Sequence, residues 1–281
     1  MEHPTIFDPM NPEAPVTYEH ADWQQRKWKS IPADDTFSYF GLNELDKYLY
    51  HNYLKNIKKG FYIECGAANG MEQSNTAALN FHYDWTGLLI EPNPFQYQNI
   101  LKHRVSPFWV EAKTFAACVA VNCALVSHQY KEEYIEGFFS ADPRCLQGPM
   151  TDSEIEDLEQ DADALKELEE CLCAQIKTNN DYDKKRYGDH SKTLEVPAKT
   201  LDWVLGSHEI EKADFFSLDV EGYELEVLKG WSPDKYPIKY VLIEGRFIPE
   251  KKSPINEYME QNNYRFEEHV GVNNMLYSLN N

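Results

Sequence analysis

The chain has few cations for its length. Its 281 residues carry 27 Lys and Arg against 47 Asp and Glu, a formal net charge of −20 at pH 7. Such an excess repels polyanions, so we expect neither a nucleic acid nor an anionic membrane surface as a partner. Small molecules and cationic ligands remain as candidates.

Long apolar runs are also missing. No stretch approaches the roughly 20 apolar residues that span a bilayer, and the polar start MEHPTIFDPMNPEAP lacks the features of a signal peptide. Six cysteines are present without a CxxC pair or a Cys/His spacing typical of zinc. We therefore expect a cytoplasmic protein with reduced thiols, although the even count leaves disulfides open.

The rest of the sequence is typical of one α/β domain. Residues 1–40 are rich in proline and polar residues and predict an N-terminal arm, through which a homo-oligomer can form; residues 41–281 predict the domain. Leucines and aromatics at helical spacing follow at 41–57. Short apolar runs then alternate with polar helical stretches, which indicates a mostly parallel sheet covered on both faces. The runs are FYIEC (61–65), GLLIE (87–91), VAVNCALV (119–126), ADFFSLDV (213–220) and IKYVLIEG (238–245), followed by an expected antiparallel hairpin of 263–269 and 273–279.

A helical insertion at about 140–192 interrupts this pattern. Within it, Thr151 and Glu154 have the spacing of a capping box, and an apolar stripe predicts an acidic helix over 151–177. The charges of this helix form either a solvated face or a docking surface for a basic partner.

The stretch FYIECGAANG (61–70) is the first candidate site. It takes a strand through Gly66 and Gly70 toward a helix, which brings backbone close to a ligand at the carboxyl edge of the sheet. The G-x-G-x-x-G pattern is absent, and Glu64 would repel a pyrophosphate but attract an ammonium group. S-adenosylmethionine, with adenosine at one end and a cationic amino acid at the other, satisfies both requirements. An ordinary tight turn is the alternative.

The ends of the next two strands extend this site. Glu91 lies at the end of its strand, where a carboxylate can accept hydrogen bonds from ribose hydroxyls. The alternative is an exposed acid at the strand end that has no ligand. The small or neutral residues at 122–125 can border an adenine ring.

Five ordered segments resemble the FkbM-type S-adenosylmethionine-dependent methyltransferases: ECGAANG, IEPNP, VPAKTLDWVL, FFSLDVEGYELEVLKGW and YVLIEGR. The resemblance runs from about residue 60 to 279, excluding much of 127–192. The loop begins with Glu64-Cys65, where the family more often has Asp followed by an apolar residue. Glu in place of Asp preserves the charge. The long acidic insertion leaves the acceptor open.

This resemblance implies a Rossmann-like seven-stranded methyltransferase fold, mostly parallel with an antiparallel C-terminal hairpin. It also implies O-methylation, often of sugars or other hydroxylated small molecules, although the same core occurs in animal proteins without evident catalysis. The implied cofactor contacts fall into three groups: Glu64, Gly66, Ala67, Asn69 and Gly70 around the methionine part, Glu91 and Asn93 at the ribose, and Asn122, Ala124 and Leu125 at the adenine.

Carboxylates at the later strand ends are the candidate catalytic groups. Asp219 is the first candidate for a base or an acceptor-orienting group, with Glu221 as its partner. Alternatively, Asp219 holds the loop and Glu221 caps the following helix. Glu224 and Glu226 are expected to be solvated helix residues.

Glu244 ends the fifth strand beside Arg246 and either shapes the acceptor pocket or forms an ion pair. A divalent metal on Asp219, Glu221 and Glu244 is conceivable, with Asp219 as the best single ligand, but it is not predicted.

Three hypotheses follow from the sequence. The first is S-adenosylmethionine-dependent O-methylation of a small hydroxylated acceptor. The second is an inactive methyltransferase-fold adaptor that binds a protein through the acidic insertion. The third, a nicotinamide-dependent oxidoreductase, is disfavoured by the missing G-x-G-x-x-G pattern and by Glu64.

Overall fold

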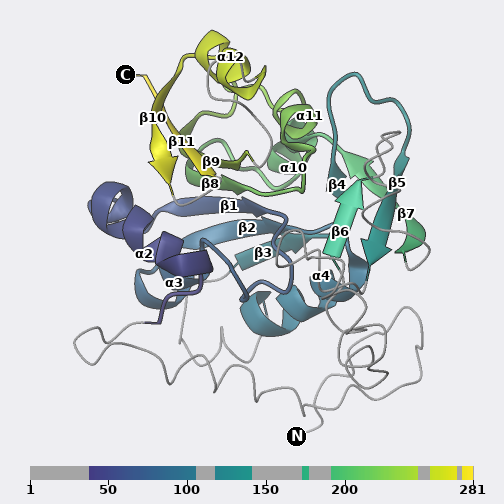
Figure 1. The fold of residues 1–281 in the computed structure, drawn as a ribbon, viewed down its shortest axis with the longest axis horizontal. Helices are drawn as coiled ribbons and strands as arrows, with labels where there is room; N and C mark the ends of the chain where they lie inside the picture. The colour runs from purple at the N-terminus through teal and green to yellow at the C-terminus, as the bar shows by residue number, and fades with distance from the viewer. Residues whose placement is uncertain are drawn as a thin grey trace, which may run out of the picture.

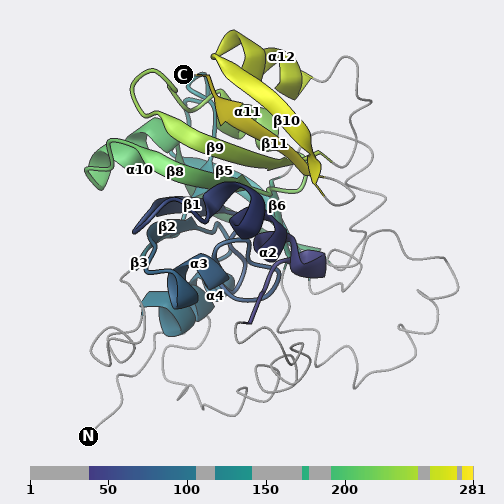
Figure 2. The same cartoon turned by 90° about the vertical axis from the view of Figure 1, so that its left-hand side faces the viewer.

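A computed structural model describes residues 38–105, 118–140, 173–176, 191–245, 254–270 and 274–280. Its centre is a seven-stranded sheet in the order β10-β11-β9-β8-β1-β2-β3 (Figures 1 and 2). The five strands from β9 to β3 are parallel, and β11 and β10 complete the sheet as an antiparallel hairpin. The predicted fold class is therefore confirmed. The strand bounds are Phe61–Cys65 (β1), Thr86–Ile90 (β2), Cys118–Val121 (β3), Ala213–Leu218 (β8), Ile238–Glu244 (β9), Tyr264–Val270 (β10) and Asn274–Leu279 (β11).

Alternating residues of the strands enter two cores, one on each face of the sheet. Tyr62 packs with helices that precede β3, whereas Ile63 packs with helices that follow β7. The first group comprises α2 (Leu45–Leu49), η3 (Tyr50–Leu54), α3 (Ala77–His82), α4 (Pro94–Ile100) and η4 (Leu101–Val105), and it is preceded by η2 (Leu42–Glu44), which has no buried residue. The second comprises α10 (Leu201–Ser207), α11 (Glu224–Leu228) and α12 (Pro254–Gln261). The helical pattern predicted at 41–57 corresponds to the run from Leu42 to Leu54, which is kinked near its start because Asn43 and Glu44 have left-handed φ angles of +55° and +60°.

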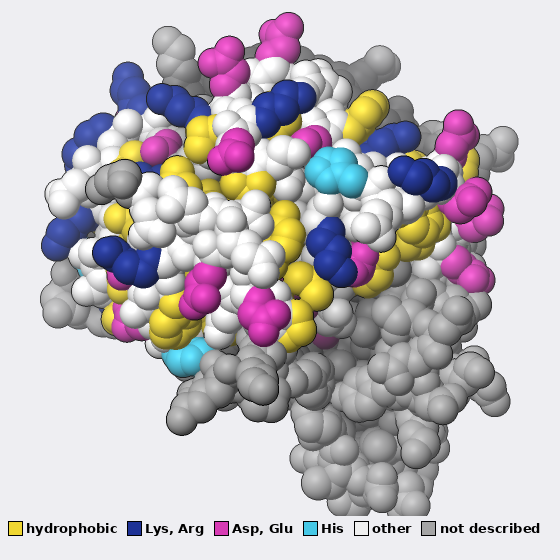
Figure 3. Space-filling view, turned by 90° about the horizontal axis from the view of Figure 1, so that it is seen from above, with side chains coloured by type: hydrophobic (Ala, Val, Ile, Leu, Met, Phe, Trp, Pro, Cys, Tyr) yellow, Lys and Arg dark blue, Asp and Glu magenta, His cyan; other side chains and the backbone are white. Residues whose placement is uncertain are grey.

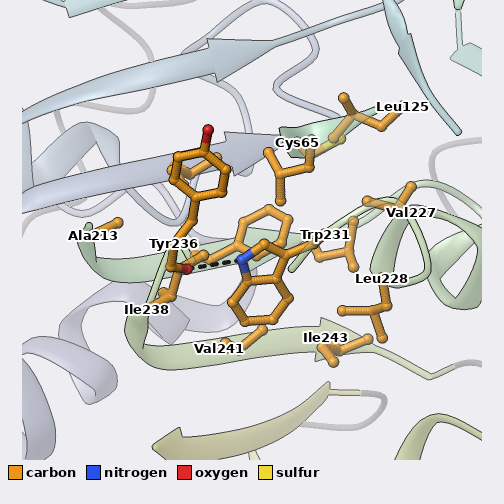
Figure 4. Packing of buried hydrophobic residues seen from close by; sticks show 14 of the residues in the cluster. Cys65, Leu125, Ala213, Val227, Leu228, Trp231, Tyr236, Ile238, Val241 and Ile243 are labelled. Carbon is orange, nitrogen blue, oxygen red and sulfur yellow. Dashed lines mark hydrogen bonds between the residues drawn. The ribbon is translucent and has the colours of Figure 1, made fainter. Parts of the chain in front are cut away.

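Trp231 anchors the second core. Its indole lies among aliphatic side chains of the sheet and of α11 and donates a hydrogen bond to the Tyr236 carbonyl at 2.9 Å (Figure 4). Asp202, near the start of α10, accepts hydrogen bonds from the backbone N–H and the hydroxyl of Ser232 at 2.7 and 2.6 Å. This contact joins the start of α10 to the turn after α11, so each segment helps to hold the other in place.

A second sheet, in the order β4-β7-β5-β6, was not predicted. It consists of β4 (Ala124–Leu125), β5 (Tyr134–Ser140), β6 (Cys173–Ile176) and β7 (Ser191–Lys199), and it lies beyond the carboxyl ends of β1 and β8 (Figure 1).

Two sequence predictions need correction here. The run 119–126 is not one strand, because the chain leaves the main sheet after Val121 and enters the small sheet at Ala124. Residues 173–176, at the end of the helix predicted over 151–177, pair with β5 as a strand. Most of that helix and residues 1–37 of the predicted arm lie outside the described residues.

Two expectations about the whole chain can be checked on its described part. Cys65, Cys118 and Cys123 are buried free thiols. None of the described helices combines the length and the apolar character that crossing a membrane requires.

Candidate functional site

Gly66 draws three strand ends together. Its N–H donates to the Ile90 carbonyl at 3.1 Å, and the N–H of Asp219 donates to the Cys65 carbonyl at 3.1 Å. Gly66 has φ +76°, and a Cβ at this position would lie 1.7 Å from the Asp219 carbonyl oxygen. Only glycine allows β1, β2 and β8 to approach this closely, so the predicted loop stands at the carboxyl edge of the central strands.

The rest of the loop is held by local hydrogen bonds. Gly70 has φ +79°, and its N–H donates to the Ala67 carbonyl at 2.8 Å. The side-chain oxygen of Asn69 accepts from Met71 N at 3.0 Å and Glu72 N at 2.8 Å. The loop is thus a fixed turn, and the methionine contacts expected of Ala67, Asn69 and Gly70 stay predictions.

Glu64 is buried and already bound by the protein. Its carboxylate accepts from Asn75 N at 2.8 Å and from the hydroxyls of Ser74 and Thr76 at 2.8 and 2.6 Å. Glu64 therefore organises the turn before α3, a role that the sequence did not reveal. Its contact with a ligand ammonium group stays a prediction.

Glu91 joins the glycine loop to the end of β2. One oxygen accepts from Ala68 N at 2.9 Å and the other from Asn93 N at 2.8 Å. Burial raises the pKa of Glu91 to about 7, although both N–H donors lower it. A carboxylate offers about four acceptor positions, so two remain for the hydroxyls of a ribose.

The other predicted cofactor residues mainly have structural roles. Asn93 is fully buried and caps α4 by accepting from Phe95 N at 2.9 Å. Asn122 donates to the carbonyls of Glu91 and Pro92 at 2.7 and 3.0 Å. Ala124 and Leu125 are buried core residues of β4. Their contacts with ribose and adenine stay predictions.

Three carboxylates meet beside the loop. Asp219, Glu224 and Glu244 each place one oxygen within 4.8 Å of the others. Asp219 is exposed, whereas the other two side chains are buried. Burial raises the pKa of Glu224 to about 7, and the charge of Asp219 adds to this shift. Hard oxygen ligands in this arrangement suit a divalent cation such as Mg²⁺.

The prediction that Glu224 is a solvated helix residue is wrong. Its Oε1 accepts from Val220 N at 3.1 Å and from Gly222 N at 3.0 Å, so it closes the turn that follows Asp219. Glu221, which we expected beside Asp219 and Glu244, occupies the left-handed region of this turn at φ +57° and lies outside the trio. Arg246 lies outside the described residues.

A pocket of about 400 Å³ is found elsewhere on the molecule. It lies between the turn after α11 and α12 and is lined by His128, Lys229 and Asn262, among others. None of the predicted site residues lines it.

A comparison with protein families gives a match over most of the chain. A model of the methyltransferase FkbM domain matches residues 64–266. Among solved structures, the crystal structure of methyltransferase FkbM from Methylobacillus flagellatus KT is similar, with 13% sequence identity and a TM-score of 0.42. The similarity covers 83% of this chain and 50% of that one, so the chain spans about half the length of that protein. A comparison with curated proteins gave no match.

Proposed function

Since the chain belongs to the methyltransferase FkbM domain family, we propose that it is an S-adenosylmethionine-dependent methyltransferase that methylates a hydroxyl oxygen of a small molecule. The observation that carries the proposal is the junction of β1, β2 and β8. There a glycine turn, a buried acid with unused acceptor positions and an exposed acid lie at one edge of the sheet.

The reaction needs little chemistry from the protein. S-adenosylmethionine supplies a methyl group whose bond to sulfur breaks as a bond to the acceptor oxygen forms, with the sulfur retaining the electron pair. The acceptor hydroxyl must then lose its proton to a base. Asp219 is our candidate for that base because it is an exposed carboxylate at the tip of β8.

Glu224 replaces Glu221 as the partner of Asp219 in this proposal. Its pKa of about 7 lets it hold a proton near neutral pH. A protonated Glu224 reduces repulsion around an ionised Asp219 and can donate a hydrogen bond within the trio. Glu244 borders the same position, where it can orient the acceptor or help to hold a cation.

Calorimetric titration with S-adenosylhomocysteine tests the cofactor part of the proposal. We expect micromolar binding by the wild-type protein, loss of binding in Glu91→Ala, and no heat with NADH. No binding at millimolar ligand by a folded protein would reject the enzyme and favour the adaptor.

A turnover assay tests the chemistry. Small hydroxylated acceptors, among them sugars, are incubated with S-adenosylmethionine with and without Mg²⁺, and S-adenosylhomocysteine is measured. For an acceptor that is methylated, Asp219→Asn should lower kcat by about 10²-fold or more, as expected for the loss of a general base. Unchanged kcat in Asp219→Asn would remove this residue from the mechanism.

The cytoplasmic location expected from the sequence stays a prediction.

A further inference from the structure

Two consecutive side chains of η4 hold two consecutive carbonyls of the glycine loop. His103 Nδ1 donates to the Asn69 carbonyl at 2.9 Å, and Arg104 Nη1 donates to the Gly70 carbonyl at 2.6 Å. A carbonyl oxygen only accepts, so Nδ1 of His103 carries a proton. Both contacts connect residues more than 30 positions apart in the sequence.

Arg104 is fully buried, and the described residues around it satisfy its donors without a direct carboxylate partner. Nη2 donates to the Tyr62 hydroxyl at 2.6 Å and to Thr76 Oγ1 at 3.3 Å, and Nε donates to Asn80 Oδ1 at 3.3 Å. A buried guanidinium is costly unless its hydrogen bonds are made. Displacing the glycine loop would take the Gly70 carbonyl away from Nη1 of Arg104. The buried charge therefore opposes movement of the loop.

The segment that carries this pair begins beside Glu91. Asn93 caps α4, and its backbone N–H donates a hydrogen bond to the Glu91 carboxylate. Helix α4 continues directly into η4. One helical segment therefore contacts the acid at the end of β2 with its first residues and the glycine loop with its last. The two ends of the candidate cofactor site are fixed to the same element.

We propose that His103 and Arg104 are positioning residues for the amino-acid end of the cofactor. By fixing the carbonyls of Asn69 and Gly70, they preorganise the loop that would surround this part of the ligand. This inference rests on the proposed function. A preorganised loop saves the free energy of ordering it on binding, so the benefit should be confined to ligands that contact the loop.

The test compares two ligands that differ only in that end. S-adenosylhomocysteine carries the amino acid, whereas 5′-methylthioadenosine lacks it. His103→Leu cannot donate a hydrogen bond. We expect this variant to bind S-adenosylhomocysteine about tenfold more weakly than the wild-type protein, which is the equivalent of one such bond. Binding of 5′-methylthioadenosine should stay unchanged.

His103→Asn is the matched control, because its Nδ2 lies as many bonds from the backbone as Nδ1 of histidine, can donate to the Asn69 carbonyl, and should restore binding of S-adenosylhomocysteine to within about twofold. Arg104→Lys keeps the charge but loses the planar fork, and it should also weaken S-adenosylhomocysteine selectively. Thermal unfolding establishes that each variant is folded. If Arg104→Lys does not fold, the two His103 variants alone decide the question.

Three outcomes would overturn the inference. Equal weakening of both ligands in His103→Leu would give His103 a general structural role only. Unchanged binding of both would show that the contact does not position the loop for the ligand. Failure of the folded wild-type protein to bind either ligand would reject the proposed function together with this inference.

Discussion

At the scale of single residues, Gly66 decides whether the site can form. The methyl group of an alanine there would lie 1.7 Å from the Asp219 carbonyl oxygen. The alanine would also have to adopt the left-handed φ of +76° that Gly66 has. Overlap and backbone strain each cost on the order of 1–3 kcal/mol, so Gly66→Ala should lower the free energy of unfolding by about 2–6 kcal/mol. Urea denaturation followed by tryptophan fluorescence measures this change.

Gly222 offers the matched control for that prediction. It also has positive φ, +103°, but a Cβ there has no atom within 4 Å. Gly222→Ala should therefore show the strain alone and cost about 1–3 kcal/mol, which is less than the loss in Gly66→Ala. Equal losses in the two variants would mean that the contact with Asp219 is unimportant.

Glu91 should make cofactor binding depend on pH. Its pKa of about 7 in the folded protein lies above its ordinary value of 4.5, because burial disfavours the charge. The folded state thus binds more protons than the unfolded state between these pH values, and stability should fall as pH rises through this window. Ribose hydroxyls donate to the ionised carboxylate, so binding should require loss of this proton.

We therefore expect the affinity for S-adenosylhomocysteine to rise about tenfold from pH 6 to pH 8, as a single ionisation with a pKa near 7 dictates. Calorimetry across this range measures the rise. Glu91→Gln should bind more weakly and lose the dependence. A wild-type affinity that does not change with pH would exclude Glu91 as an ionising ligand contact.

At the scale of elements, Glu224 closes the turn between β8 and α11. Glu224→Ala leaves Val220 N and Gly222 N without their acceptor, which should lower the free energy of unfolding by about 2 kcal/mol. Glu224→Gln retains an acceptor oxygen and should lose less than about 1 kcal/mol. Chemical denaturation at pH 7 separates these cases.

Glu226, on the same helix, provides the control. It forms a surface pair with Lys229 at 2.6 Å, with both side chains more than a third exposed. Glu226→Ala should change the stability by no more than about 0.5 kcal/mol. A loss as large as that of Glu224→Ala would mean that losing a negative charge from the first turn of α11, not opening the turn, explains both results.

Elements could be predicted from the sequence where periodicity alone determines them. The runs 61–65 and 238–245 form β1 and β9 because they are mostly apolar and each follows a residue that interrupts regular structure, Gly60 or Pro237. The run 119–126 was equally apolar, yet the side chain of Asn122 binds the carbonyls of Glu91 and Pro92 where the chain leaves the sheet. Such a contact is not visible in hydrophobic spacing.

The candidate site was predictable only in part, for a similar reason. Glu91 and Asp219 follow strand ends, so their placement at the carboxyl edge comes from topology. Glu224 was misjudged because helical spacing places it on α11, whereas the turn before α11 folds back over its carboxylate. His103 and Arg104 carry no motif, and only the fold brings them to the loop.

At the scale of the whole molecule, the two sheets differ in how far sequence could predict them. The main sheet follows from strands that alternate with helices, together with the terminal hairpin. The small sheet depends on β5, β6 and β7, which are separated by long segments and pair in an antiparallel way. The apolar stripe at 151–177 predicted a helix, and pairing with β5 determined the structure of residues 173–176 instead.

The net charge of −20 leads to a last prediction. On the face seen from above in Figure 1, Lys and Arg side chains are interspersed with Asp and Glu side chains (Figure 3). The excess of acids is therefore not visible as one acidic patch on this face. Over the whole chain, repulsion between acids should destabilise the compact state. Raising NaCl from about 10 to about 150 mM shortens the screening length from about 30 to about 8 Å, which should raise Tm at pH 7.5 by about 3 °C.

Differential scanning calorimetry measures this shift, and pH supplies its control. Near pH 5 the net charge approaches zero because the sequence pI is about 4.8, so long-range repulsion vanishes there. The same salt increase should then leave Tm nearly unchanged. A similar rise at both pH values would indicate specific ion binding, and a fall at pH 7.5 would show that attractive pairs outweigh the acidic excess.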